Sequence, residues 1–112
     1  MRVLVVGKQQ PSAEPEFWPT LRERATVVSR GTENNIVLFF ADTAEHLIQL
    51  SLLRSRIIPA GAIWVVFPKG TKTIRDTDVI AAGKDHRLVD NKVAGFSDTH
   101  TAMRLVVPVR YR

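Results

Sequence analysis

The sequence predicts one α/β domain with a mostly parallel, Rossmann-like sheet in three layers that ends in an antiparallel hairpin. Three runs without polar alternation, RVLVV at 2–6, IVLFFA at 36–41 and AIWVVF at 62–67, are typical of strands buried on both faces. Helix-like segments separate these runs, and such alternation favours βαβ units with helices on the faces of a parallel sheet. A short polar turn at 97–101 then joins two further apolar segments, which indicates an antiparallel hairpin.

Length and composition limit the class of protein. The 112 residues fit a single domain, 1–112, and an apolar content of 45% argues against disorder. The chain has no cysteine, which excludes disulfides, thiolate catalysis and cysteine-based metal sites. We find no secretory signal and no apolar run near the roughly 20 residues that span a membrane. The expected compartment is therefore the cytoplasm, without membrane association.

The chain is basic, with a formal net charge of +5. Positive charge favours polyanionic partners, but here the lysines and arginines are dispersed and form no continuous block. Charge alone supplies only the non-specific part of nucleic-acid binding. A weak nucleic-acid binder is therefore kept as an alternative function and not as the leading one.

The first half of the chain contains a strand at 2–6, a short helix at 16–24 and a weak strand at 25–29. Pro19 fits this helix only within its first turn, because proline lacks the backbone donor that later turns need. Only six residues, 30–35, link the second and third strands, whereas a parallel crossover usually needs a dozen. The second strand is therefore either short and irregular or antiparallel at an edge.

A longer helix is expected to follow the strand at 36–41. Asp42 and Glu45 have the spacing of a capping box at the start of a helix. Apolar residues then recur at helical spacing up to Pro59, where the helix would stop, and Gly61 would allow a turn before the strand at 62–67. The residues of this apolar stripe are Ala44, Leu47, Ile48, Leu52 and Ile58.

A second, shorter helix is expected from Asp76 or Thr77 to Ala82, with Gly83 as its stop. Asp76 and Asp78 at its start are interpreted as helix-capping residues and not as paired catalytic carboxylates. The hairpin that follows comprises 88–96 and 103–109, and Pro108 marks a strand end or an edge. The tryptophans, Trp18 and Trp64, are expected in the core.

The carboxyl ends of the strands are the expected place for a site, because ligands of open parallel sheets bind there. Lys69 follows one strand and lies in a basic loop, so it could hold an anion, although a solvated loop lysine is the simpler interpretation. Asp98 and His100 at the hairpin turn could form an acid–base pair, whereas the simpler interpretation is a histidine that hydrogen-bonds the turn. The candidate anion or ligand site comprises Lys69, Asp98, His100 and Arg104.

No cofactor site is predicted. A nucleotide or S-adenosylmethionine site needs glycines after the first strand, where backbone amides approach the ligand. That loop reads GKQQPSAEP with a single glycine, and Ser29 and Arg30, not an acidic residue, end the second strand. The three histidines, His46, His86 and His100, have no metal-ligand spacing. The prediction is therefore no cofactor-binding residues, no metal and no catalytic constellation.

The segments AGAIWVVFPKG, RDTDV and LVDNKVAGFSDTHTAMRLVVPV resemble DUF3052, a bacterial family of small uncharacterised proteins. The resemblance covers residues 36–109 and departs at His100, where many members have tryptophan. It implies a trimmed methyltransferase-type Rossmann domain that keeps the last strands and the hairpin but lacks the cofactor loop; no activity is established for the family. The positions that carry it are Trp64, Pro68, Lys69, Thr77, Asp78, Val93, Asp98, His100, Ala102, Met103 and Arg104.

The leading interpretation is a non-catalytic protein that acts by binding a ligand or partner, or by self-association. A small anion is the expected ligand, and a homodimer is the expected assembly because the edge strands of a small open sheet need cover. The alternative from another class is a minimal transferase-type enzyme that uses the strand-end rim.

Overall fold

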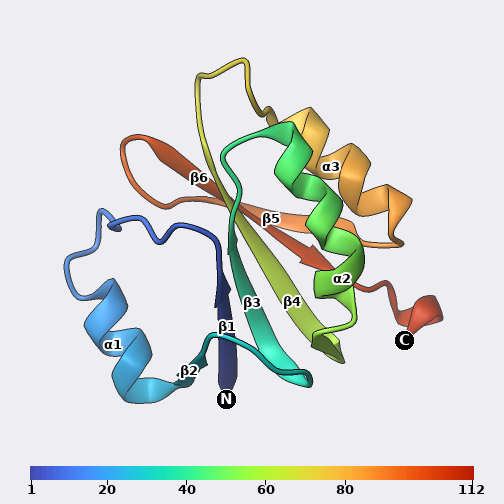
Figure 1. Ribbon diagram of the computed structural model, residues 1–112, viewed down its shortest axis with the longest axis horizontal. Helices are drawn as coiled ribbons and strands as arrows, with labels where there is room; N and C mark the ends of the chain where they lie inside the picture. Colours follow the sequence, from blue (N-terminus) through green and yellow to red (C-terminus); the bar gives the residue numbers. More distant parts are fainter.

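The computed structural model describes all 112 residues and contains one six-stranded sheet in the order β2-β1-β3-β4-β6-β5 (Figure 1). The first four strands run parallel, β6 runs antiparallel to β4, and β5 runs antiparallel to β6. The predicted fold class is therefore confirmed. The strands are β1 (Arg2–Val6), β2 (Thr26–Val28), β3 (Asn34–Phe40), β4 (Ile57–Pro68), β5 (Val89–Gly95) and β6 (His100–Val106).

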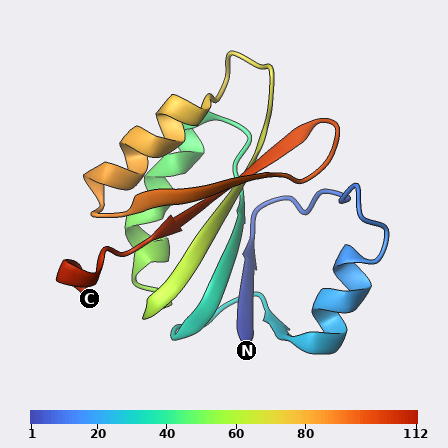
Figure 2. The ribbon, with the colours of Figure 1, turned by 180° about the vertical axis from the view of Figure 1, so that it is seen from behind.

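The helices cover the two faces of the sheet unequally. One face carries a 3₁₀ helix and two α-helices, whereas the other carries α1 alone, which lies beside β1 and β2 (Figures 1 and 2). None of these helices is long and apolar enough to cross a lipid bilayer. The helices are α1 (Phe17–Arg24), η1 (Ala44–Gln49), α2 (Leu50–Arg54) and α3 (Asp76–Asp85), and a last 3₁₀ turn is η2 (Val109–Tyr111).

The hydrophobic core is divided by the sheet into two clusters of different size. Alternation along each strand sends successive side chains to opposite faces. The face under η1, α2 and α3 holds a cluster of 17 buried residues, whereas the face under α1 holds only 6. In β4, Ile63 and Val65 join the larger cluster, while Trp64 packs at the border of the smaller one. Trp18 and Trp64 are only half-buried, so the expectation that both are core residues is wrong.

The sequence left two alternatives for the second strand, a short, irregular strand or an antiparallel edge strand, and the structure has the short one. β2 has three residues and pairs parallel to β1, so the antiparallel alternative is wrong. A short link to β3 suffices because β2 and β3 flank β1 near its beginning, where Val3 pairs with both Val27 and Ile36. The chain therefore only crosses the start of β1. Gly31, with φ of 116°, lies in this link.

The helix predicted after Asp42 differs from the structure. The chain forms η1 and then α2, which ends at Arg54, and Ile58 belongs to β4. The predicted capping box is absent; instead, the Asp42 amide donates to Nδ1 of His46 at 3.1 Å. The buried stripe consists of Leu47, Leu50 and Leu53, and the predicted stripe residues Ile48 and Leu52 are 78% and 55% exposed.

β4 begins earlier than predicted, at Ile57, because a buried asparagine fixes its start. Asn34 is 0% exposed, and both its backbone amide and its Nδ2 donate to the Arg56 carbonyl, at 3.0 and 2.9 Å. The expected turn at Gly61 is thus part of the strand. A Cβ there would lie 2.7 Å from the Asn35 carbonyl oxygen, so this glycine permits close contact with β3.

Three local predictions can be compared directly with the structure. α1 forms as expected, with Pro19 in its first turn. The hairpin is confirmed, and Pro108 follows the end of β6. Gly83 does not stop α3, which continues to Asp85. A Cβ at Gly83 would make only ordinary contacts, the nearest 3.4 Å from the Leu88 carbonyl oxygen, so the helix does not require glycine there.

Replacing Gly7 with alanine is expected to lower the free energy of unfolding by about 2–4 kcal/mol. Gly7 has φ of 90°, and a Cβ there would press on the Phe40 carbonyl oxygen. Gly95→Ala is the control, because a Cβ at Gly95 meets nothing within 4 Å; its effect should stay within about 1 kcal/mol. Urea unfolding measures both variants, and equal losses would contradict the expectation.

Candidate functional site

The rim at the carboxyl ends of β1, β3 and β4 also contains the hairpin turn, because β6 starts where β4 ends. Pro68 pairs with His100, and the Lys69 amide donates to the Thr99 carbonyl at 3.0 Å. Lys69 therefore lies beside the turn that carries Asp98 and His100. The two parts of the predicted site on this rim are neighbours in the structure.

The hairpin turn satisfies its own polar groups. Ser97 Oγ accepts from the amides of Thr99 and His100, at 3.3 and 3.1 Å. Nδ1 of His100 lies 2.8 Å from Oγ1 of Thr99, and Asp98 is exposed. The hydrogen-bond partner of the His100 ring is thus Thr99 and not Asp98. This geometry supports the simpler interpretation, in which His100 helps to fix the turn.

Arg104 lies apart from the other three predicted site residues. It is in the middle of β6, four residues from His100, where it pairs with Trp64 on one side and Lys92 on the other. Four residues of an antiparallel strand span about 13 Å. The structure therefore brings Lys69, Asp98 and His100 to the rim and places Arg104 on the face of the sheet.

A polar hollow of about 480 Å³ lies at the rim between the end of β4 and the start of α3. Lys69 and Arg75 line it together with Asp76. The neighbouring carboxylates serve the helix start, as the sequence predicts: Asp78 Oδ2 accepts from the Arg75 amide and Asp76 Oδ1 from the Thr77 amide, each at 2.9 Å. The hollow offers two cationic side chains to an anion.

The loop that follows β1 is tied to the hairpin. The Ala13 amide and the Ser12 hydroxyl both donate to the Phe96 carbonyl, at 2.9 and 3.2 Å. Trp18 Nε1 donates to the Gln10 carbonyl at 2.9 Å, which fixes the loop to α1. These bonds direct the loop along the α1 face of the sheet.

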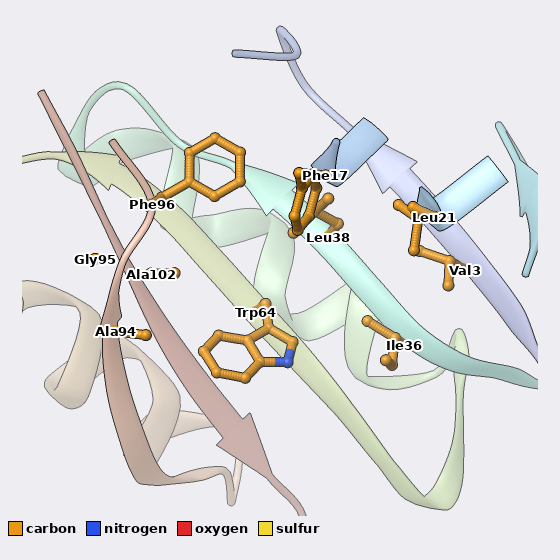
Figure 3. Close-up of a pocket in the computed structure, with 10 residues that line it drawn as sticks. All are labelled: Val3, Phe17, Leu21, Ile36, Leu38, Trp64, Ala94, Gly95, Phe96 and Ala102. Carbon is orange, nitrogen blue, oxygen red and sulfur yellow. The ribbon is translucent and has the colours of Figure 1, made fainter. Parts of the chain in front are cut away.

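The same face contains an apolar groove of about 310 Å³ (Figure 3). Its floor is β3, β4 and β6, and small residues on β5 and β6 leave the hollow open. Trp64 lies along one side, and Phe17 and Phe96 lie across from it (Figure 3). The ten lining residues are Val3, Phe17, Leu21, Ile36, Leu38, Trp64, Ala94, Gly95, Phe96 and Ala102.

An aromatic cluster holds the wall of the groove opposite Trp64. Phe17 packs edge-on against Phe96, with ring centroids 5.3 Å apart, and Phe96 packs edge-on against Phe40 at 5.7 Å. Trp18 lies 5.1 Å from Phe17 and 5.9 Å from Phe40. Such pairs contribute about 0.5–1.5 kcal/mol each beyond burial. The cluster therefore fixes α1 against the hairpin and defines the width of the groove.

The groove has the chemistry of a binding site for an apolar or aromatic group. Nine of its ten lining residues are hydrophobic and none carries an ionisable side chain. No group of three or more His, Cys, Asp or Glu side chains is placed to hold a metal ion anywhere in the chain. The groove was not predicted from the sequence. The run AIWVVF is apolar throughout, so no alternation in the sequence marks Trp64 as facing the side that a single short helix covers.

No family model matches the chain, and no curated protein matches it by sequence. Solved structures do share its fold. LaPhzM is 9% identical with a TM-score of 0.65, and 96% of this chain aligns with 50% of it. The O-methyltransferase NcsB1 from neocarzinostatin biosynthesis, in complex with S-adenosylmethionine and 2-hydroxy-5-methyl naphthoic acid, is 14% identical with a TM-score of 0.65, and 96% of this chain aligns with 49% of it.

The magnesium protoporphyrin IX methyltransferase ChlM from Synechocystis PCC 6803, with bound S-adenosylmethionine, is 16% identical with a TM-score of 0.58, and 94% of this chain aligns with 60% of it. The chain spans about half the length of the first two structures, LaPhzM and NcsB1. At these identities the likeness shows the fold alone. The chain thus has the Rossmann-like α/β fold of methyltransferases.

Replacing Ser97 with alanine is expected to lower the free energy of unfolding by about 1–2 kcal/mol, because two turn amides lose their acceptor. Asp98→Ala is the matched control, since its exposed side chain should contribute within about 0.5 kcal/mol. Thermal unfolding of both variants makes the comparison. A larger loss of unfolding free energy for Asp98→Ala than for Ser97→Ala would contradict the interpretation that Ser97 holds the turn together.

Proposed function

We propose that the chain is a non-catalytic binding protein that takes up a small apolar or aromatic ligand in the groove beside α1. The observation that carries the proposal is the lining of this groove, in which nine of ten residues are hydrophobic and three are aromatic. Apolar, partly enclosed hollows of this kind are the usual sites of small-molecule binding. A site without an ionisable lining side chain has no group for acid–base or nucleophilic catalysis.

The loop after β1 supports a binding role over nucleotide chemistry. Its one glycine, Gly7, packs against the Phe40 carbonyl, and Ser12 and Ala13 bond to Phe96. The Ala13 amide is therefore not free to hold a ligand, and the loop has a single glycine where nucleotide sites have several. Membership of DUF3052 and a cytoplasmic location remain predictions that agree with this proposal.

The test compares two classes of ligand by isothermal titration calorimetry with thermal unfolding. We expect the neutral probe 2-naphthalenemethanol to bind and S-adenosylmethionine and S-adenosylhomocysteine not to bind. A ligand at 100 times its dissociation constant stabilises the folded state by about 2.7 kcal/mol. Stabilisation by the methyl donor, without any by the naphthalene probe, would overturn the proposal.

Filling the groove should abolish binding of this probe without unfolding the chain. Ala94 lines the groove on the edge strand β5 and is half-buried, so Ala94→Leu is expected to occupy the space and weaken binding at least tenfold. Ala81→Leu is the matched control, because Ala81 is exposed on α3 and does not line the groove. Equal affinities for the two variants would place the probe elsewhere.

A second candidate is a minimal transferase that uses the strand-end rim. The fold favours it, because structures with this fold include NcsB1 and ChlM, whose names state methyltransferase activity and whose complexes contain S-adenosylmethionine. In that case the hollow beside Lys69 and Arg75 would take the anionic part of a ligand. Binding of S-adenosylmethionine that Lys69→Ala weakens would support the transferase. If S-adenosylmethionine at millimolar concentration does not bind, a transferase that uses this methyl donor is excluded.

A further inference from the structure

One end of the apolar groove is positively charged. Directly opposed residues of neighbouring antiparallel strands point to the same face of a sheet. Arg104 on β6 is opposed to Trp64 on β4, and Lys92 on β5 is opposed to Arg104. Trp64 lines the groove, so the Arg104 and Lys92 side chains start from that same face, in the row that crosses the sheet through Trp64.

The charge at this end is not balanced by a neighbouring carboxylate on the same row. Asp90, the nearest acidic residue along β5, is opposed to Leu105 and therefore starts from the other face. Residues two apart in a regular strand point to the same face, but the register shifts between Asp90 and Lys92, so these two side chains start from opposite faces. Lys92 is exposed and Arg104 is half-buried. Two cations thus stand beside an apolar hollow.

Arg104 also keeps its hydrogen-bond donors for a ligand. The arginine side chains that donate hydrogen bonds within the chain are those of Arg2 and Arg112. Others stack on aromatic rings: Arg22 on Trp18, and Arg87 and Arg110 on Tyr111. Arg104 does neither. A guanidinium presents a planar fork that matches the two oxygens of a carboxylate.

We propose that the ligand of the groove is a small aromatic carboxylate, a deduction that rests on the proposed function. Its ring system would lie between Trp64 and the pair Phe17 and Phe96, and its carboxylate would reach Arg104, with Lys92 adding charge. Ala102 in the hollow is two residues from Arg104 on the same strand, which is about 7 Å. An arginine side chain spans that distance to a carboxylate attached directly to a ring.

The volume of the groove and its aromatic walls favour a small aromatic carboxylate over a long aliphatic acid. A volume of about 310 Å³ is at the lower end of small-molecule pockets and suits one or two rings. Flat walls of aromatic side chains favour offset or edge-on contacts with another ring. The positive charge of Arg104 and Lys92 beside the groove favours a ligand that carries a negative charge.

Calorimetry with two probes of the same shape tests the proposal: 2-naphthoate and the neutral 2-naphthalenemethanol. We expect the unmodified chain to bind the naphthoate at least tenfold more tightly, which is about 1.4 kcal/mol. Arg104→Gln should remove this preference and leave binding of the alcohol unchanged. Arg110→Gln, at the exposed C-terminal turn, is the control and should retain the preference.

Each other outcome overturns a defined part of the deduction. Equal binding of the two probes by the unmodified chain, or a preference that Arg104→Gln retains, rejects the carboxylate and leaves the groove as a neutral site. Binding of neither probe rejects the proposed function itself. Sedimentation of the same samples detects a dimer. A stable dimer that binds neither probe would mean that a second copy of the chain covers the groove, and it would reject both the carboxylate ligand and the proposed function. Thermal unfolding confirms that Arg104→Gln is folded.

Discussion

The unequal cover of the two sheet faces determines most of this structure. A sheet that is mostly parallel needs apolar cover on both sides. Here η1, α2 and α3 lie on one side, where the cluster of 17 buried residues forms, and only α1 lies on the other (Figure 2). The α1 helix has eight residues and lies over the β1 end of the sheet. The apolar surface of β4 and β6 on that side is therefore left as a groove and not as core.

The aromatic cluster compensates in part for the missing cover. Phe17, Trp18, Phe40 and Phe96 come from α1, β3 and the hairpin, so their contacts join segments that are distant in sequence. The loop after β1 follows the same path and bonds to Phe96. The stability of α1, the position of the loop and the width of the groove thus depend on one set of rings. A change at Phe96 would affect all three together.

The sequence predicted those elements whose signals are local. The bounds of β1, the position of α1 and the hairpin follow from apolar runs, a proline and a turn, and all agree with the structure. The start of β4 did not follow, because Asn34 bonds to the backbone of Arg56, which is distant in the chain. The predicted end of α3 was wrong, because Gly83 is accommodated within the helix. The helical spacing of Ile58 was coincidental, since that residue belongs to β4, directly after the residue that pairs with Asn34 of β3.

The candidate site also has a part that the sequence predicted and a part that it did not. The rim placement of Lys69 and His100 required only that the strand ends meet at one edge of the sheet, which the alternation of elements implies. The groove required the register of three strands and knowledge of which face each helix covers. Trp64 and Arg104 are 40 positions apart in the chain and become opposed only through the pairing of β4 with β6. No local pattern contains that information.

The free edge strand β5 has a consequence for assembly. Exposed edges can template the addition of further strands, and proteins suppress this with charges and irregular backbone. β5 contains the exposed charged residues Asp90 and Lys92 and departs from regular pairing between them, while the opposite edge strand, β2, has only three residues. Lateral growth of the sheet into ribbons is thus disfavoured at both margins, and the chain is left to meet other molecules through its broad faces.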